Sequence, residues 1–407
     1  MSTSDKPIVL AFSGGLDTSF CVPWLADTYS RPVVTATVNT GGLDQAASAA
    51  LADKARALGA VEHVEIDARA EFFDTVLKHL IIGNVRRGNL YPLCVGAERG
   101  VQAWHLAGAA KQFGSTTVAH GCTAAGNDQI RFEIILKALA PDLEVLAPVR
   151  DNNFQRETQI EFLTERGMPL PSKGSSYSIN RGLWGITIGG TETLTSEQSI
   201  PESAWVLSSG ALGSGKAPES IEIAFEQGVP VALNGESLDP VALIERLEML
   251  GASFAIGRGI HLGDTILGTK GRVAFEAPAA AILLDAHREL EKLTLGAAQA
   301  RFKDQLALGY GDLIHEGKQL DPVCADIEAF FASSQRRVTG TVTVELRPGS
   351  LFVTGVHSPH SLMAASRGTY GESTGEWTSA DAVGFSRILA LPGMLHARAQ
   401  DASGEEV

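Results

Sequence analysis

The residues best suited to chemistry lie near the start of the chain, where a short apolar strand is expected to run into a polar loop. The loop reads Ser13-Gly14-Gly15-Leu16-Asp17-Thr18-Ser19. Glycines let the backbone turn its N–H groups towards phosphate oxygens, and the N-terminus of the next helix adds a positive dipole end. Hydroxyl groups supply further donors. The segment predicts a pyrophosphate-binding loop, in preference to a turn that uses glycine only for its geometry.

This loop differs from a Walker loop, which closes a longer glycine arch with a lysine and a hydroxyl residue. Pyrophosphate held here would leave the α-phosphate of ATP exposed, so we expect adenylation with release of pyrophosphate. Asp17 is expected either to cap the next helix or to hold the Mg²⁺ that accompanies ATP. Residues 210–217 approach a Walker pattern but lack its hydroxyl, and a surface loop is expected there.

A second polar cluster follows a strand expected over residues 116–120. It contains Thr123, Asn127, Asp128 and Arg131, at the start of an expected helix. A helix cap would explain one of these residues but not all four. Arg131 lies one turn beyond Asn127, so both can point at one ligand that carries a carboxylate.

Several other polar residues have a structural alternative. His120 ends a strand and is interpreted as a buried core residue rather than a base. His357 and His360 lack a third ligand at metal-binding spacing, so their proline-containing turn explains them better. Residues 270–272 could bind an anion or form a solvated turn, and Tyr91 could contact a ligand or only pack.

The elements that must position the two clusters alternate between strand and helix up to residue 168. Expected strands cover residues 8–12, 33–38, 61–66, 116–120 and 143–147. This alternation predicts the α/β class, with a parallel, Rossmann-like sheet covered on both faces. Ligands of such sheets bind at the carboxyl ends of the strands, where both polar clusters begin.

A change of character at residues 169–176 predicts a boundary between a nucleotide-binding domain (1–168) and an α+β domain (169–365). The second domain is expected to contain a β-meander over residues 221–233 and late strands over 339–346 and 351–357. Residues 366–407 are expected to form a helix and a polar tail, which could dock as an oligomer arm.

Composition narrows the class of partner. The 407-residue chain has a net charge of −14, which argues against nucleic acid or an anionic membrane as the main partner. Small-molecule substrates fit better. The four cysteines form no C-x-x-C pair, and neither a signal region nor a membrane-spanning run is evident, so a cytoplasmic protein is expected.

With both clusters in view, the chain resembles the argininosuccinate synthase family over essentially its whole length. The loop at residues 13–19 is similar to that family's pyrophosphate loop, and residues 120–133 are similar to its amino-acid signature. The resemblance implies ATP- and Mg²⁺-dependent condensation of citrulline with aspartate through a citrullyl-adenylate, releasing AMP and pyrophosphate. It also implies an N-terminal PP-loop domain, a C-terminal synthetase and multimerisation domain, and a homotetramer.

The resemblance also implies site residues. Ser13, Asp17 and Asp128 would be catalytic. Aspartate would meet Thr123, Asn127 and Asp128. The residues implied to line the ATP site are Ala11, Phe12, Ser13, Gly14, Gly15, Leu16, Asp17, Thr18, Ser19, Val38 and Gly121. Those implied to meet citrulline are Tyr91, Asn127, Arg131, Ser178 and Thr187.

The chain departs from the family pattern on the citrulline side. Gly96, Gly263 and Phe275 stand where Ser, Glu and Tyr are expected, and Asp264 is the candidate to replace the missing carboxylate. Residues 124–125 and 181–182 also differ from the pattern. The alternatives are a PP-loop enzyme that adenylates a modified citrulline such as N-acylcitrulline, another adenylating enzyme of the tRNA-modifying or NAD-forming kind, and a nucleotide-binding sensor without catalysis.

Overall fold

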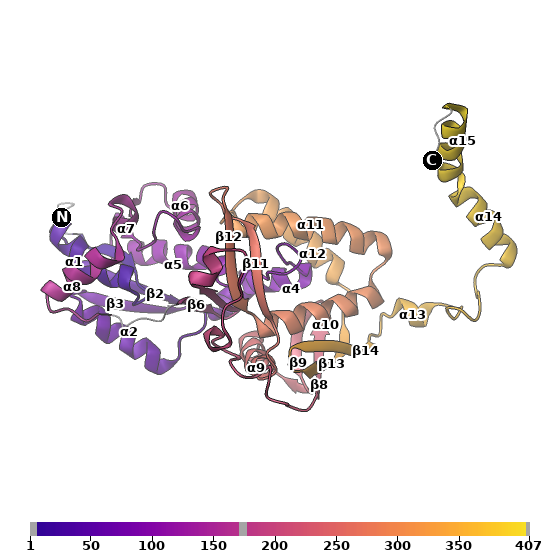
Figure 1. The fold of residues 1–407 in the computed structure, drawn as a ribbon, viewed down its shortest axis with the longest axis horizontal. Coiled ribbons are helices and arrows are strands. Elements are labelled where there is room, and N and C mark those ends of the chain that lie inside the picture. The colour runs from indigo at the N-terminus through magenta and orange to yellow at the C-terminus, as the bar shows by residue number, and fades with distance from the viewer. Residues whose placement is uncertain (1–5, 171–176, 404–407) are drawn as a thin grey trace. The chain divides into compact units, whose positions relative to one another are not determined.

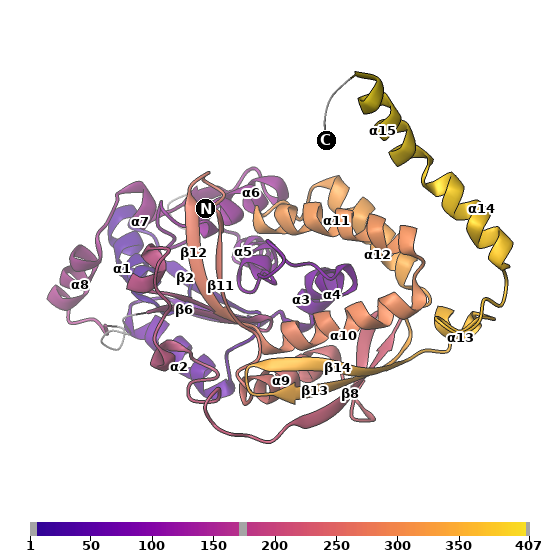
Figure 2. The same ribbon diagram turned by 45° about the vertical axis from the view of Figure 1, so that its right-hand side comes forward.

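The computed structural model describes residues 6–170 and 177–403, so the boundary expected at 169–176 falls largely outside the described residues. The chain forms two compact units, Met1–Pro359 and His360–Val407. All elements of the two polar clusters belong to the first unit, which Figures 1 and 2 show from two directions. The division of this unit at residue 168 stays a prediction.

A five-stranded parallel sheet forms the first part of the chain, in the order β3-β2-β1-β4-β5. Its strands are β1 (Ile8–Ala11), β2 (Val33–Asn39), β3 (Glu62–Asp67), β4 (Thr117–Ala119) and β5 (Glu144–Leu146). The principal helices around it are α1 (Leu16–Tyr29), α2 (Gln45–Ala57), α5 (Arg99–Gln112), α6 (Asp128–Leu139) and α8 (Arg156–Glu165). The predicted α/β class and the alternation of strand and helix are confirmed.

The two faces of this sheet bury separate cores, because successive side chains of a strand point to opposite sides. Ile8 and Leu10 of β1 pack in one cluster with apolar residues of α1, α2 and α8. Val9 packs in another cluster with residues of α5 and α6. Both faces are therefore covered, and the polar loops at the strand ends stay free for ligands.

The second half contains a five-stranded antiparallel sheet in the order β10-β9-β8-β13-β14. Its strands are β8 (Glu219–Glu226), β9 (Val229–Leu233), β10 (Glu236–Ser237), β13 (Gly340–Arg347) and β14 (Ser350–His357), so the predicted meander and late strands are confirmed. Helices α9 (Pro240–Ala252) and α10 (Pro278–Thr294) pack with this sheet in the largest core. That core also includes residues of α4 (Lys78–Gly83), α11 (Ala297–His315) and α12 (Pro322–Gln335).

A separate four-stranded sheet was not expected from the sequence. It has the order β11-β12-β7-β6 and consists of β6 (Ser178–Gly182), β7 (Gly185–Gly189), β11 (Arg258–Asp264) and β12 (Lys270–Glu276). Ile186, Ile188 and Ala274 are buried on one of its faces, in a cluster with Ile200 and Trp205. The other face carries Thr187 and His261, whose side chains line the pocket described below.

The second unit contains α13 (Leu362–Ala365), α14 (Ser379–Leu389) and α15 (Leu391–Ser403). Thr378 and Asp381 form a capping box that fixes the start of α14. The polar tail expected at the end of the chain is helical as far as residue 403, because α15 continues into it. Among the described helices, none combines the length and apolar character that a membrane span requires.

Candidate active site

The pyrophosphate loop joins β1 to α1 through a backbone that requires glycine. Gly14 has a φ of 72°, and a Cβ there would lie 2.4 Å from Cδ2 of Leu51. Gly15 is the N-cap residue of α1 and no side chain caps the helix, so the interpretation of Asp17 as a cap is wrong. Asp17 instead lines the adjoining pocket. This leaves the metal-holding alternative for Asp17.

The implied ATP-site residues differ in whether their side chains are exposed to a ligand. Ser13 is exposed, and its Oγ lies 3.2 Å from Oγ1 of Thr18. Ser19 is buried and donates to the Gly14 carbonyl at 3.3 Å, while Phe12 and Leu16 are core residues. Ser13 and Thr18 can therefore offer hydroxyl groups to a ligand, whereas the buried members can contribute only backbone groups.

Lys54 is a cation beside this loop that sequence reasoning missed. It comes from the last turn of α2, and its Nζ donates to the Gly14 carbonyl at 2.5 Å. Burial lowers the pKa of this amine. A lysine near a phosphate loop can neutralise phosphate charge, but no local spacing signals its approach, because forty residues of chain separate it from Gly14.

The two polar clusters meet at Gly121. A Cβ on Gly121 would lie 3.0 Å from Cγ2 and 3.1 Å from the backbone N of Thr18, so a side chain at this residue would crowd the pyrophosphate loop. Val38 ends β2 in the same sheet and is partly buried against the main core. The parallel sheet thus brings the pyrophosphate loop and the segment after β4 to one edge, as the sequence predicted.

Asp128 lies between two arginines. Its Oδ1 accepts from Nη1 of Arg131 at 2.6 Å, and its Oδ2 is 3.0 Å from Nε of Arg99. These guanidinium groups outweigh burial and hold the pKa of the carboxyl below its usual value. Asn127 is the N-cap of α6 without a side-chain cap bond, so capping explains neither Asn127 nor Asp128. Arg99 is a further site residue that sequence reasoning missed.

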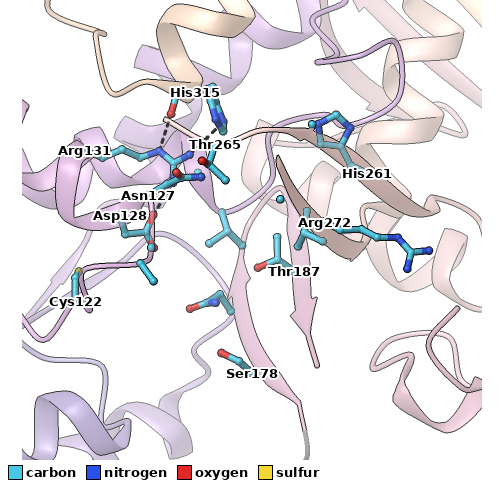
Figure 3. Close-up of a pocket in the computed structure, with 18 of the residues that line it drawn as sticks. Cys122, Asn127, Asp128, Arg131, Ser178, Thr187, His261, Thr265, Arg272 and His315 are labelled. Atoms are coloured by element: carbon cyan, nitrogen blue, oxygen red, sulfur yellow. Dashed lines mark hydrogen bonds and ion pairs between the residues drawn. The ribbon is translucent and has the colours of Figure 1, made fainter. Parts of the chain in front are cut away.

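Side chains of this cluster also form hydrogen bonds with residues from the second half of the chain. Arg131 donates through Nε to the His315 carbonyl at 2.7 Å and contacts the His315 ring, as Figure 3 shows. The Oδ1 of Asn127 accepts from the backbone N of Ile266 at 2.9 Å. Both residues are thus positioned by contacts that a sequence cannot reveal, and His315 joins the site from α11.

Glu98 lies behind this cluster and has a pKa raised to about 7 by burial, despite the opposing charge of Arg99. Its Oε1 accepts from Arg99 at 3.0 Å, whereas Oε2 is buried and has no hydrogen-bond partner within the part of the chain that the structure describes. Because the folded pKa exceeds the unfolded one, the folded state binds the extra proton, and this group makes the protein less stable as the pH rises from about 4.5 to 7.

We therefore expect Glu98→Gln to remove part of the loss of stability between pH 5 and pH 7.5. Urea unfolding of both proteins at the two pH values measures this effect. The free energy of unfolding of the wild type minus that of the variant should fall as the pH rises. A difference that is constant, or that rises with pH, would contradict a raised pKa at Glu98.

A pocket of about 500 Å³ connects these groups. Figure 3 shows Cys122 and Asp128 on one side of it, His261 on the other, and Ser178 and Thr187 between them. Thr123, Asn127 and Arg131 also line it. The structure therefore brings all the implied aspartate and citrulline residues to one cavity, next to Asp17 and Gly121 of the ATP side.

Tyr91 combines the two alternatives left open for it. The ring is buried, stacks on His261 with centroids 5.4 Å apart, and packs against Phe275. Its hydroxyl donates to the Cys94 carbonyl. Tyr91 also lines the pocket, so it can meet a ligand through its ring while its hydroxyl serves the fold.

Other candidates have structural roles. His120 is buried, stacks on Phe132 and accepts from the Cys122 N–H, and burial lowers its pKa to about 4, in line with the core interpretation. Arg272 donates to the carbonyls of Glu192, Thr195 and Gln198, and Lys270 pairs with Asp264. Residues 270–272 begin β12, so the solvated-turn alternative is wrong for them, and the anion-binding alternative stays a prediction. The glycine-rich residues 210–217 lead into β8 rather than a helix, unlike a Walker loop.

Comparison with known families agrees with this geometry. Residues 7–169 match the family described as Arginosuccinate synthase N-terminal HUP domain, and residues 177–396 match the Arginosuccinate synthase C-terminal domain. The chain belongs to the argininosuccinate synthase family. It is 40% identical over 394 residues to argininosuccinate synthase of Dictyoglomus turgidum, covering 96% of this chain and 98% of the relative.

Other members of the family are similarly close. The argininosuccinate synthase of Methanocaldococcus jannaschii is 38% identical over 392 residues, covering 96% of this chain and 98% of the relative. That of Lactococcus lactis subsp. cremoris is 37% identical over 396 residues, covering 97% and 98%. Family membership supports an ATP-dependent ligase of arginine biosynthesis that joins citrulline to aspartate.

Proposed function

We propose that this pocket catalyses both half-reactions of argininosuccinate synthesis. ATP would bind with its pyrophosphate on residues 13–19, and the ureido oxygen of citrulline would attack the α-phosphorus and release pyrophosphate. The α-amino group of aspartate would then attack the activated ureido carbon and displace AMP. The observation that carries this proposal is the contact of Gly121 with Thr18, which joins the pyrophosphate loop to the segment that holds Asp128.

Each group has a proposed task. Ser13 and Thr18 would donate hydroxyl hydrogen bonds to pyrophosphate, with Lys54 as a nearby cation. Asp128 would pair with the ammonium of aspartate, and its arginine partners keep the carboxyl ionised. No general base is assigned, so most of the rate would come from holding the ureido oxygen at the α-phosphorus and from stabilising charge at the loop.

Magnesium fits the donor set of this proposal. Asp17 offers a carboxylate that does not cap α1, and hard oxygen donors suit Mg²⁺. When bound with ATP, the metal would neutralise charge on the departing pyrophosphate. We also propose a cytoplasmic homotetramer, as the family resemblance implies. The apolar side chains of α14 and α15 support an oligomer arm; they include Val383, Phe385, Ile388, Leu389 and Leu395.

The assignment is tested by steady-state release of pyrophosphate with each substrate omitted in turn. Release is expected only when ATP, citrulline and aspartate are all present, with AMP and argininosuccinate formed in equal amounts. A nucleotide-binding sensor would release no pyrophosphate under any condition. Release that does not depend on aspartate would show that another nucleophile takes the adenylate.

A further inference from the structure

One wall of the pocket is built by the hairpin of β11 and β12, and its register decides which side chains face the ligand. His261 pairs with Val273, and Gly263 pairs with Gly271, so these four residues share one face. All four line the pocket. Ile260, Leu262 and Asp264 alternate with them and belong to the opposite face, where Ile260 packs against the cluster of Ile186 and Ile188.

Asp264 still lines the pocket, but its side chain alternates with the face that carries His261 and Gly263. It pairs with Lys270, the residue opposite it in the register, and its side chain is 61% exposed. The sequence left open that Asp264 replaces the carboxylate absent at residue 263. The register argues against this replacement, since a shift by one residue moves a side chain to the other face of a sheet.

His261 occupies the space that a side chain at residue 263 would need. A Cβ on Gly263 would lie 2.5 Å from Nε2 of His261 and 3.1 Å from Nη1 of Arg87. His261 is 9% exposed, and its Nε2 is buried without a hydrogen-bond partner among the described residues. Burial and the nearby Arg87 lower the pKa of the imidazole, so the ring is neutral near pH 7. The tautomer that carries the proton on Nε2 would present a donor to the pocket, beside the guanidinium of Arg87.

This wall suits a ligand atom that accepts hydrogen bonds. Arg87 is the nearby cation, and its partner Asp312 is 63% exposed. The carboxylates among the described lining residues are Asp17, Asp128 and Asp264, and the first two belong to the ATP and aspartate side. The two carboxylates near Arg87 are already paired, Asp264 with Lys270 and Asp312 with Arg87 itself. An ammonium placed at this wall would have to compete with these cations, whereas a carbonyl oxygen would accept from Arg87 or from the buried imidazole.

The substrate is oriented by the position of the ATP loop. The ureido group must reach the side of Asp17 and Gly121, so the α-carbon end of an extended citrulline points towards His261. Gly96 lines the same pocket, and a Cβ there would lie 3.3 Å from Nη2 of Arg131. Gly271, opposite Gly263, also presents no side chain. The groups at the α-carbon end of the substrate are thus His261 and Arg87, with no side chain at residues 263 and 271 between them and a ligand.

We propose that the wall formed by Arg87, His261 and Gly263 receives the acylated α-nitrogen of a citrulline derivative, so that an Nα-acylcitrulline is used at least as well as free citrulline. This inference rests on the function proposed above. The acyl carbonyl accepts from His261 or Arg87, and the reaction at the ureido group is unchanged. Acylation removes the positive charge that would otherwise face Arg87.

The test compares kcat/KM for L-citrulline, Nα-acetyl-L-citrulline and 5-ureidopentanoate, with ATP and aspartate saturating and pyrophosphate release as the readout. A ratio of Nα-acetylcitrulline to citrulline of one or more supports the inference, and a ratio below one overturns it. Equal or better use of 5-ureidopentanoate than of Nα-acetylcitrulline would also overturn it, since no acyl group would then be recognised. If none of the three supports turnover, the proposed function itself fails.

A pair of variants tests the wall directly. His261→Ala makes room at residue 263, and in that background Gly263→Glu adds a carboxylate whereas Gly263→Gln adds the same volume without charge. The glutamate variant is expected to shift the ratio towards free citrulline by about tenfold or more relative to the glutamine variant. Equal ratios in the two would overturn the inference.

Asp264→Ala tests the rival account: if it alone abolishes a preference for free citrulline, Asp264 holds the ammonium and the inference is wrong.

Discussion

Replacing Asp128 with alanine is expected to lower kcat/KM for aspartate by about a hundredfold or more, because it removes the carboxylate of a partly buried, hydrogen-bonded charge pair at the substrate. The change removes the proposed partner of the aspartate ammonium and leaves Arg99 and Arg131, whose side chains are 10% and 7% exposed, facing each other. Exchange of labelled pyrophosphate into ATP with citrulline alone should fall less than tenfold, because that half-reaction does not use aspartate.

Asp128→Asn is the matched control, since it keeps the shape of the side chain and removes its charge. If the charge binds aspartate, the asparagine variant should lose nearly as much kcat/KM as the alanine variant. Equal loss in both half-reactions would show instead that Asp128 acts by holding Arg99 and Arg131 in place. Urea unfolding of each variant separates a loss of function from a loss of fold.

Ser13→Ala and Asp17→Asn are each expected to reduce citrulline-dependent exchange of pyrophosphate into ATP by about a hundredfold or more, the typical cost of losing one electrostatic contact at the reacting group. Ser13 is exposed and Asp17 does not cap α1, so neither change should disturb the core. The physical reason is the loss of a pyrophosphate donor in one case and of a metal-holding oxygen in the other.

Asp27→Asn is the control for this pair, because Asp27 lies on the same helix and pairs with the surface residue Arg166. Its exchange rate should stay within about twofold of wild type, as expected for an exposed ion pair. Near-normal exchange in both loop variants would show that residues 13–19 do not hold the pyrophosphate, even if the protein still binds ATP.

The sequence alone determined the parallel sheet and the place of the two polar clusters. The alternation of apolar strands with helices is a local pattern, and the bounds of α6 (Asp128–Leu139) follow from it directly. Gly14 and Gly121 could also be identified locally, because loops at the carboxyl ends of parallel strands converge whatever the rest of the chain does. The family resemblance rests on these same local motifs.

Only the tertiary structure decided the far wall of the pocket. The sheet of β6, β7, β11 and β12 has glycine-rich, polar strands without a clear alternation, so its strands were not expected. Lys54, Arg99 and His315 reach the site from helices whose own sequences give no signal of it.

Asp264 shows most directly why the sequence could not decide which side chains face the ligand. In the sequence, Asp264 stands next to Gly263 and can replace a missing carboxylate. In the structure, adjacent residues of a strand face opposite sides, and pairing with Lys270 fixes which side Asp264 takes. Residue types and local periodicity specify which groups are available, whereas strand register and long-range packing specify which of them face the ligand.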